Sequence, residues 1–153
     1  MNFFKRKAVR YSLLALLILG AGAAYYGYTE YNRKVKDIAT MHPDFTVQAA
    51  VLLDEFSKND SLSSKKYLDK VVAITGVLKS LDKDEKGFFT VVLGDPAANS
   101  SIRCSMDSAH NAEAATLSNG SIIEVKAICT GYNADDLGLG ADVMFNHSCI
   151  IKK

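Results

Sequence analysis

Motifs typical of catalytic and metal-binding proteins are missing from this sequence of 153 residues. It has no Cys-x-x-Cys pair, no glycine-rich phosphate-binding loop and no calcium-binding loop of the EF-hand type. The three histidines, His42, His110 and His147, are scattered and stand at no ligand spacing from a cysteine, which argues against a zinc site. Because no nucleophile is accompanied by a local base, we expect a protein that is not an enzyme and uses no cofactor.

Internal repeats and low-complexity segments are also absent, and the length favours one modest domain. The formal net charge of +1 hides an uneven distribution. Residues 1–43 carry seven Lys or Arg against two acidic residues, whereas residues 44–153 carry eleven against fifteen. The first part is therefore basic, and the second part, which contains the expected folded domain, is mildly acidic.

Formal charges are missing from Tyr11–Thr29, a run of nineteen residues that follows four basic residues within residues 1–10. A helix of about 20 apolar residues crosses the bilayer core, and a basic flank keeps its side of the membrane cytoplasmic. We therefore expect a transmembrane anchor at this run, a juxtamembrane stalk at residues 30–43 and an extracytoplasmic domain at residues 44–153.

A cleaved signal peptide is the alternative for the same run. Leu13–Leu19 would be its apolar region, and Ala21-Gly22-Ala23 would be its cleavage site. No cysteine directly follows the apolar run, so a lipoprotein signal is not supported. Both alternatives export the domain.

A helical pattern begins at Asp44. Four apolar residues between Ala49 and Phe56 recur at the spacing of one helix face, which predicts a helix that packs on the rest of the domain. The segment Ser61–Leu68 predicts a second, shorter helix.

Val71–Ser80 is the stretch around which we expect the domain to be organised. It is long for a strand, rich in β-branched residues and interrupted by Gly76, as expected of a first barrel strand that must bend to serve both sheets. Four further segments have strand patterns, and the Ala-rich segment Asp107–Leu117 between them predicts a helix. These four segments are Phe88–Leu93, Ser101–Met106, Ser121–Thr130 and Asp142–Ile151.

The resulting order is strand-strand-strand-helix-strand-strand. It is the plan of an OB-fold, a mainly β, five-stranded Greek-key barrel, here with a helix between the third and fourth strands. A small β-sandwich is the alternative, but it offers no natural position for that helix.

Several motifs of the domain resemble a known family. They include Lys66-Tyr67-x-x-Lys70-Val71-Val72, Thr75-Gly76-Val77, Leu117-x-Asn119-Gly120, Cys129-Thr130-Gly131-Tyr132 and Val143-x-Phe145-x-x-x-Cys149. Over Phe45–Ile151 the chain resembles the tRNA_anti-like family of small exported bacterial OB-fold proteins. The resemblance implies the OB-fold but no particular activity. In a bacterium the expected anchor would lie in the inner membrane and the domain in the periplasm.

Nucleic-acid binding is frequent among OB-folds and requires a basic groove with stacking aromatic side chains. Phe88, Arg103 and Tyr132 are the candidate binding residues on the expected face. We nevertheless expect an envelope protein or a small ligand as partner, and not nucleic acid. The reason is that the loops beside this face would repel a polyanion, because they hold Asp82, Asp84 and Glu85, and Asp135, Asp136 and Asp142.

Four of these carboxylates, Asp82, Asp84, Asp135 and Asp136, are candidate ligands for a cation such as Ca²⁺. Lysines interrupt the first pair of carboxylates and supply their own counter-charges. We therefore expect solvated loops and no metal site.

The three cysteines, Cys104, Cys129 and Cys149, share the parity of the apolar residues in their strands. Export would bring them to an environment in which disulfides persist. If the last two strands form a hairpin, Cys129 and Cys149 can lie opposite each other within bridging distance. We expect this bridge and a free Cys104. A bridge between Cys104 and Cys149, or three free thiols, are the alternatives.

These features predict a membrane-anchored, extracytoplasmic OB-fold module that binds an unidentified ligand or partner. The alternatives are a single-stranded nucleic-acid binder and an envelope protein that binds a small ligand or a cation. A basic groove would favour the first alternative, and a lined pocket or clustered carboxylates would favour the second.

Overall fold

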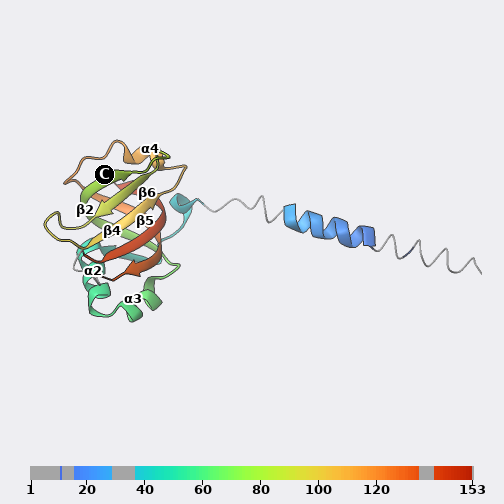
Figure 1. Cartoon of the computed structure of the whole chain (residues 1–153), viewed down its shortest axis with the longest axis horizontal. Coiled ribbons are helices and arrows are strands. Elements are labelled where there is room, and N and C mark those ends of the chain that lie inside the picture. Colours follow the sequence, from blue (N-terminus) through green and yellow to red (C-terminus); the bar gives the residue numbers. More distant parts are fainter. Residues whose placement is uncertain (1–10, 12–15, 29–36, 135–139, 153) are drawn as a thin grey trace, which may run out of the picture. The chain divides into compact units, whose positions relative to one another are not determined.

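The structure is a computed structural model that describes residues 11, 16–28, 37–134 and 140–152, and the chain divides into two units, Met1–Val35 and Lys36–Lys153. In the first unit, residues 16–28 form a helix (Figure 1). Among the described residues, no helix is both long and apolar enough to cross a membrane. Parts of the expected anchor and stalk, residues 12–15 and 29–36, lie outside the described residues.

The second unit contains a closed five-stranded barrel (Figure 1). Its strands follow one another in the order β2-β3-β4-β6-β5, and pairing between β2 and β5 closes the circle. All neighbours are antiparallel except β4 and β6, which run parallel. The expected OB-type barrel is confirmed. Its strands are β2 (Val71–Lys83), β3 (Phe89–Leu93), β4 (Ser101–Met106), β5 (Ile122–Asn133) and β6 (Asp142–Lys152).

The long strand β2 serves both sides of the barrel. It pairs with β5 as far as Val77 and with β3 from Leu78 onward, where the register also shifts. Gly76 lies two residues before Leu78, where the partner changes. A Cβ atom at Gly76 would lie 2.7 Å from the Cβ of Ala49, so glycine is required there for the close approach of a helix as well.

A short strand, β1 (Phe45–Gln48), precedes the helix α2 (Ala49–Lys58), so the helix predicted from Asp44 begins later than expected. β1 runs parallel to β2, and its residues alternate between half-buried and exposed. Asp44 fixes the start of this pairing, because its backbone N–H donates to Val71 O at 2.7 Å and its carboxylate accepts from Val71 N at 3.0 Å. The following helix α3 (Asp60–Tyr67) agrees with the predicted second helix.

The helix predicted at Asp107–Leu117 is much shorter, because only α4 (Asn111–Ala114) is helical. The side chain of Asn111 binds the barrel instead of the helix: its Oδ1 accepts from Phe89 N at 2.7 Å, and its Nδ2 donates to Gly87 O at 3.0 Å. These bonds hold the segment against the β2–β3 hairpin.

The main core fills the barrel and extends under α2 and α3, where Phe56 and Tyr67 are buried. A smaller second cluster lies outside the main core, where the short 3-10 helix η1 (Ile38–Thr40) places Ile38 against Val71 and Cys149. Residues 37–43, assigned to the stalk by sequence, therefore lie at least partly on the domain.

Candidate binding site

The expected OB binding face carries one of the predicted residues, Arg103 on β4, in an ion pair. Its guanidinium donates to Asp82 Oδ2 at 2.8 Å, and Asp82 also accepts from Ser80 Oγ at 3.2 Å. Both partners of the ion pair are partly exposed, with 35% and 48% of their side chains accessible. The positive charge of Arg103 is thus neutralised within the chain.

Phe88 lies in the turn before β3 and is 42% exposed. Asp84 shapes this turn, because its Oδ1 accepts from Lys86 N at 2.9 Å and from Phe88 N at 2.7 Å. Two of the candidate cation ligands, Asp82 and Asp84, are therefore engaged in an ion pair and a turn. The described residues include no group of three or more His, Cys, Asp or Glu that could hold a metal, and Asp135 and Asp136 lie outside them.

Tyr132, the third candidate binding residue, packs at the edge of the core. Its ring stacks on Phe56 of α2, with centroids 5.1 Å apart and an interplanar angle of 27°. Tyr132 comes from β5, whereas Arg103 comes from β4 and Phe88 from the turn before β3. The three residues thus belong to three different parts of the domain, and Tyr132 has a packing role.

The expected disulfide between Cys129 and Cys149 is not formed, and all three cysteines are buried free thiols. Cys129 lies opposite Phe145, and Cys149 lies opposite Lys126. Phe145 and Cys149 are four residues apart, or about 13 Å along a strand. The assumed register is therefore incorrect.

The register is set beside the loop, where Asn133 pairs with Asp142, whereas a bridge from Cys129 to Cys149 would need Asn133 opposite Phe145. β6 also contains a bulge. An extra residue interrupts the β5–β6 register between Asn146 and Cys149, and His147 adopts a positive φ of 51°. After a bulge the side chains change faces. Cys149 consequently points into the small cluster with Ile38, whereas Cys104 and Cys129 are in the main core. Burial raises the pKa of Cys104 to about 12 and that of Cys129 to about 11.

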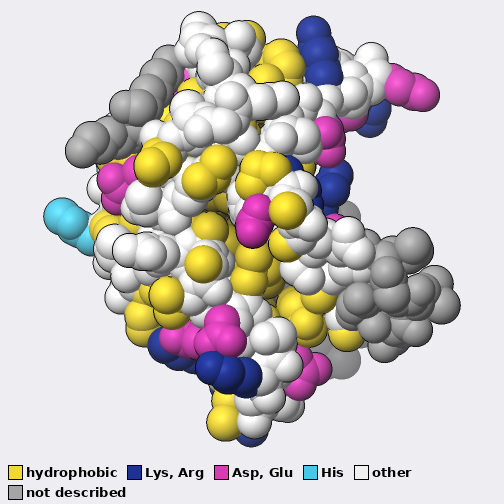
Figure 2. All heavy atoms as spheres, turned by 90° about the vertical axis from the view of Figure 1, so that its left-hand side faces the viewer, with side chains coloured by type: hydrophobic (Ala, Val, Ile, Leu, Met, Phe, Trp, Pro, Cys, Tyr) yellow, Lys and Arg dark blue, Asp and Glu magenta, His cyan; other side chains and the backbone are white. Residues whose placement is uncertain are grey.

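An open groove that sequence reasoning missed lies between α2, β2 and the loop from β3 to β4. Its volume is about 690 Å³, and most of its walls are apolar. Figure 2 shows the side on which α2 lies in Figure 1, with a band of hydrophobic side chains and acidic side chains beside it. The apolar lining residues are Ala49, Ala50, Leu53, Val77, Pro96 and Ile122, together with Ala98.

Two glycines shape the groove. Gly76 is one of its lining residues and lets Ala49 approach β2 closely. Gly94, with φ of 149°, turns the chain away from β3 into the loop. Lys79 supports this loop from the side of β2, because its Nζ donates to Ala98 O and, at 3.1 Å, to Ser101 Oγ.

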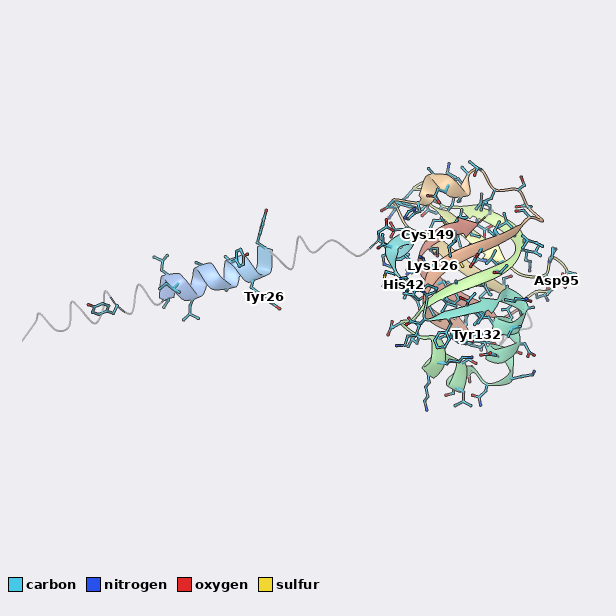
Figure 3. The ribbon with its side chains drawn as sticks, turned by 180° about the vertical axis from the view of Figure 1, so that it is seen from behind. Tyr26, His42, Asp95, Lys126, Tyr132 and Cys149 are labelled. Atoms are coloured by element: carbon cyan, nitrogen blue, oxygen red, sulfur yellow. The ribbon has the colours of Figure 1, made fainter. Side chains whose placement is uncertain are left out.

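The charged side chains that line the groove are both acidic. Asp54 is paired with Lys58 at 2.6 Å on the exposed side of α2. Asp95, labelled at the edge of the domain in Figure 3, accepts from Ala97 N at 2.9 Å through Oδ1. Among the described lining residues there is no Lys, Arg, His or Cys. The groove therefore offers apolar contact, a few hydroxyl groups from Ser57, Thr75 and Ser100, and negative charge, but no cation for a phosphate.

Only Gly76 gave a sequence signal for the groove. A glycine inside a strand indicates either a bend or the close approach of another segment, and the bend alone was inferred. The rest of the lining comes from a helix, a strand and a loop whose contacts a single sequence does not specify.

The sequence profile of the tRNA_anti-like family matches residues 1–141. The chain belongs to this family. The resemblance inferred from the sequence is thereby confirmed. No curated protein matches this tRNA_anti-like chain.

The solved structures that resemble this tRNA_anti-like protein include two that illustrate the range of similarity. A lipoprotein from Klebsiella pneumoniae subsp. pneumoniae MGH 78578, described as a candidate nucleic acid-binding protein, matches with a TM-score of 0.54 and 20% identity over 78% of this chain and 100% of its own. Asparaginyl-tRNA synthetase from Pyrococcus horikoshii matches with a TM-score of 0.39 and 15% identity over 57% of this chain and 21% of the synthetase. At such low identity, the first similarity shows the fold alone.

Proposed function

We propose that the chain is a non-catalytic OB-fold binding module, anchored in the bacterial inner membrane by residues 11–29, that holds a small apolar ligand in the groove beside α2. The groove is the observation that carries this proposal. Its volume of about 690 Å³ lies within the range of roughly 300–1,000 Å³ typical of small-molecule pockets, which are also mainly apolar with a few polar groups.

The charge of the groove limits the ligand. Asp54 and Asp95 are acidic, and none of the other lining residues carries a charge. Lys58 neutralises Asp54, so a ligand with a carboxylate or a phosphate would meet like charge mainly at Asp95. The groove therefore favours a ligand that is apolar and either neutral or positively charged.

A titration with three related aromatic probes tests both points. We expect benzyl alcohol and benzylamine to shift the amide signals of groove residues in NMR spectra, and benzoate to leave them unchanged. Ala50 lines the groove and is exposed, so Ala50→Phe should fill it and abolish these shifts. Val51 is the matched control, because it is 48% exposed on the same helix but does not line the groove.

The outcomes separate the alternatives. Shifts that survive Ala50→Phe, or that are equal for all three probes, would contradict a ligand site in the groove. Shifts that are lost in both Ala50→Phe and Val51→Phe would indicate a general effect on the helix and would also contradict it.

Nucleic-acid binding is a second candidate, supported by the description of the Klebsiella lipoprotein. The ion pair of Arg103 with Asp82 argues against it, because that cation is already neutralised. We expect labelled single-stranded DNA and RNA to show no change in fluorescence anisotropy at physiological salt. Salt-sensitive binding that Arg103→Ala abolishes would replace the ligand proposal.

The anchor has its own test. The uncharged run Tyr11–Thr29 and its basic flank support an uncleaved membrane segment. We expect the mature protein to keep its N-terminus and protease added to spheroplasts to digest the domain. A mature protein that starts at Ala24 would show a cleaved signal peptide instead.

A further inference from the structure

Residues 37–41 form a strap across the outside of the barrel. The centre of this strap is η1, which contacts both β5 and β6. Ile38 is only 1% exposed and packs against Val71 and Cys149. Figure 3 shows the labelled Cys149 and Lys126 beside this helix. The strap therefore covers an apolar patch that includes a thiol.

Lys126 ties the strap to β5. Its Nζ donates to Ala39 O and to Met41 O, both at 2.8 Å. Lys126 is only 7% exposed, so these carbonyl groups replace most of the water around the ammonium group. This tie holds the middle of η1 and the residue that follows it.

His110 ties the strap to the segment around α4. Its Nε2 lies 2.8 Å from Asp37 Oδ1, and its Nδ1 lies 3.0 Å from Glu113 Oε1. The same Asp37 oxygen accepts from Ala39 N at 2.9 Å and so caps η1. The ring is mostly buried, with 15% of the side chain exposed. One imidazole thus bridges two carboxylates from different segments.

This bridge requires the second ring proton, that is, a positively charged imidazolium. An imidazolium ring has two N–H donors and can donate to both carboxylates, whereas a neutral ring has one donor and would turn a lone pair toward the other carboxylate. The hydrogen bond to Asp37 and then the one to Glu113 raise the pKa of His110 above its ordinary value. The bond from His110 is also the main reason why the pKa of Asp37 is lowered.

The other charged groups around the strap are paired or bound elsewhere. Asp107 lies 3.1 Å from His147 Nδ1 and accepts from Ala109 N at 3.0 Å. Lys126 is held by the two strap carbonyls. His110 is therefore the group in this cluster that must be positively charged to donate to both of its carboxylate partners.

We propose that the strap is a pH-sensitive clasp, in which protonated His110 fastens residues 37–41 to the barrel and deprotonation loosens them, so that the thiol of Cys149 becomes accessible. A group with a raised pKa stabilises the folded form fully below its unfolded pKa, and this stabilisation is lost as pH rises through the folded pKa. The clasp is therefore closed at mildly acidic pH and loosens toward alkaline pH. It is independent of what the groove binds.

Alkylation of the three buried cysteines in the full chain tests the clasp. At each pH the iodoacetamide rate at each cysteine is measured by peptide mapping and divided by its rate in the urea-unfolded chain, which removes the pH dependence of the thiol itself. We expect the protection of Cys149 to fall by about two- to fivefold between pH 5.5 and pH 8.5, as for loss of a modest ion pair. Protection of Cys104 and Cys129 should stay constant, because the main core remains closed.

Two substitutions sharpen the test. His110→Gln removes the charge, so Cys149 should be less protected at pH 5.5 and no longer respond to pH. His110→Arg keeps a charge at all these values, so protection should persist at pH 8.5. A wild-type profile at Cys149 that does not change with pH, or a simultaneous loss of protection at all three cysteines, would overturn the proposal. If the Arg side chain does not fit, the wild-type and Gln profiles decide.

Discussion

Two apolar surfaces lie on the outside of the barrel, and the described part of the chain covers one of them and leaves the other open. At the first, Ile38 of the strap seals the patch around Val71 and Cys149. At the second, the groove beside α2 stays open, and Ile122 at its border is 68% exposed. Both surfaces adjoin β2, which contributes Val71 to the first and Val77 to the second.

The difference lies in the polar groups around each surface. The strap is held by Lys126 and His110, which bind its backbone and its Asp37 carboxylate. The described residues that line the groove include no such cation, and its two carboxylates, Asp54 and Asp95, lie at its walls. A surface that its own chain covers adds to the free energy of unfolding. An open apolar surface contributes free energy only when a ligand removes it from water. Substitutions at the two surfaces should therefore differ in how much they change the free energy of unfolding and the binding of a probe.

The largest effect is expected at the covered surface. Ile38→Ala should lower the free energy of unfolding by about 2–4 kcal/mol, as for large-to-small changes at buried aliphatic side chains. Val51→Ala, on the exposed face of α2, is the control and should change it by less than about 0.5 kcal/mol. Urea unfolding measures both. Equal effects would show that the strap contributes no stability and would break the comparison.

At the groove, the expected effect depends on the close contact beneath it. Gly76→Ala puts a Cβ atom 2.7 Å from that of Ala49, which should cost about 1–3 kcal/mol of unfolding free energy, as for overpacking. Gly131→Ala is the matched control, because a Cβ atom there meets nothing within 4 Å. Probe binding should weaken in Gly76→Ala alone, since α2 has to move. Similar losses of stability in both variants would mean that strand propensity, and not the helix contact, determines the role of Gly76.

The barrel could be predicted from the sequence because its signals are local. Alternation of apolar residues defines each barrel strand, and Ile123, Val125 and Ala127 are buried as their parity indicates. The β6 bulge could not be predicted in this way. The extra residue at His147 reverses the faces of the residues directly after it, so Cys149 lies outside the main core. The disulfide prediction failed because the loop sets a different register, with Asn133 opposite Asp142.

The strap and the groove depend on contacts between distant residues. His110 meets Asp37, 73 positions earlier in the chain, and Lys126 meets Ala39, 87 positions earlier. Neither pair leaves a periodic pattern. β1 was missed for a related reason, because four residues are too few for alternation to distinguish a strand from the first turn of a helix.

A smaller effect is expected for the charge that closes the strap. The Asp37 carboxylate, with its lowered pKa, contributes stability above its unfolded pKa and loses it as pH falls through the folded value. His110 has the opposite sign on the alkaline side. The stability difference between wild type and Asp37→Asn should therefore be largest at mildly acidic pH and shrink in both directions. Asp54→Asn, which removes a carboxylate far from His110 in sequence and paired with Lys58, should show no change between pH 5.5 and pH 8.5. A difference for Asp37→Asn that is equally flat would contradict the clasp.

The smallest effect is expected for the ion pair between Arg103 and Asp82 on the OB face. Arg103 and Asp82 are 2.8 Å apart, but both are partly exposed, and such pairs contribute only about 0.2–1 kcal/mol in double-mutant cycles. We expect a coupling energy in this range from urea unfolding of Arg103→Ala, Asp82→Ala and the double variant, and a decrease when salt is added.

Because the pair is weak, Asp82→Ala frees the Arg103 guanidinium without unfolding the domain. If the OB face can bind nucleic acid at all, this variant should bind single-stranded DNA more tightly than the wild type. Absence of binding even in Asp82→Ala would leave the groove as the better candidate surface, whereas tight binding in the wild type would show that the ion pair opens in the presence of a phosphate and that the OB face is the functional one.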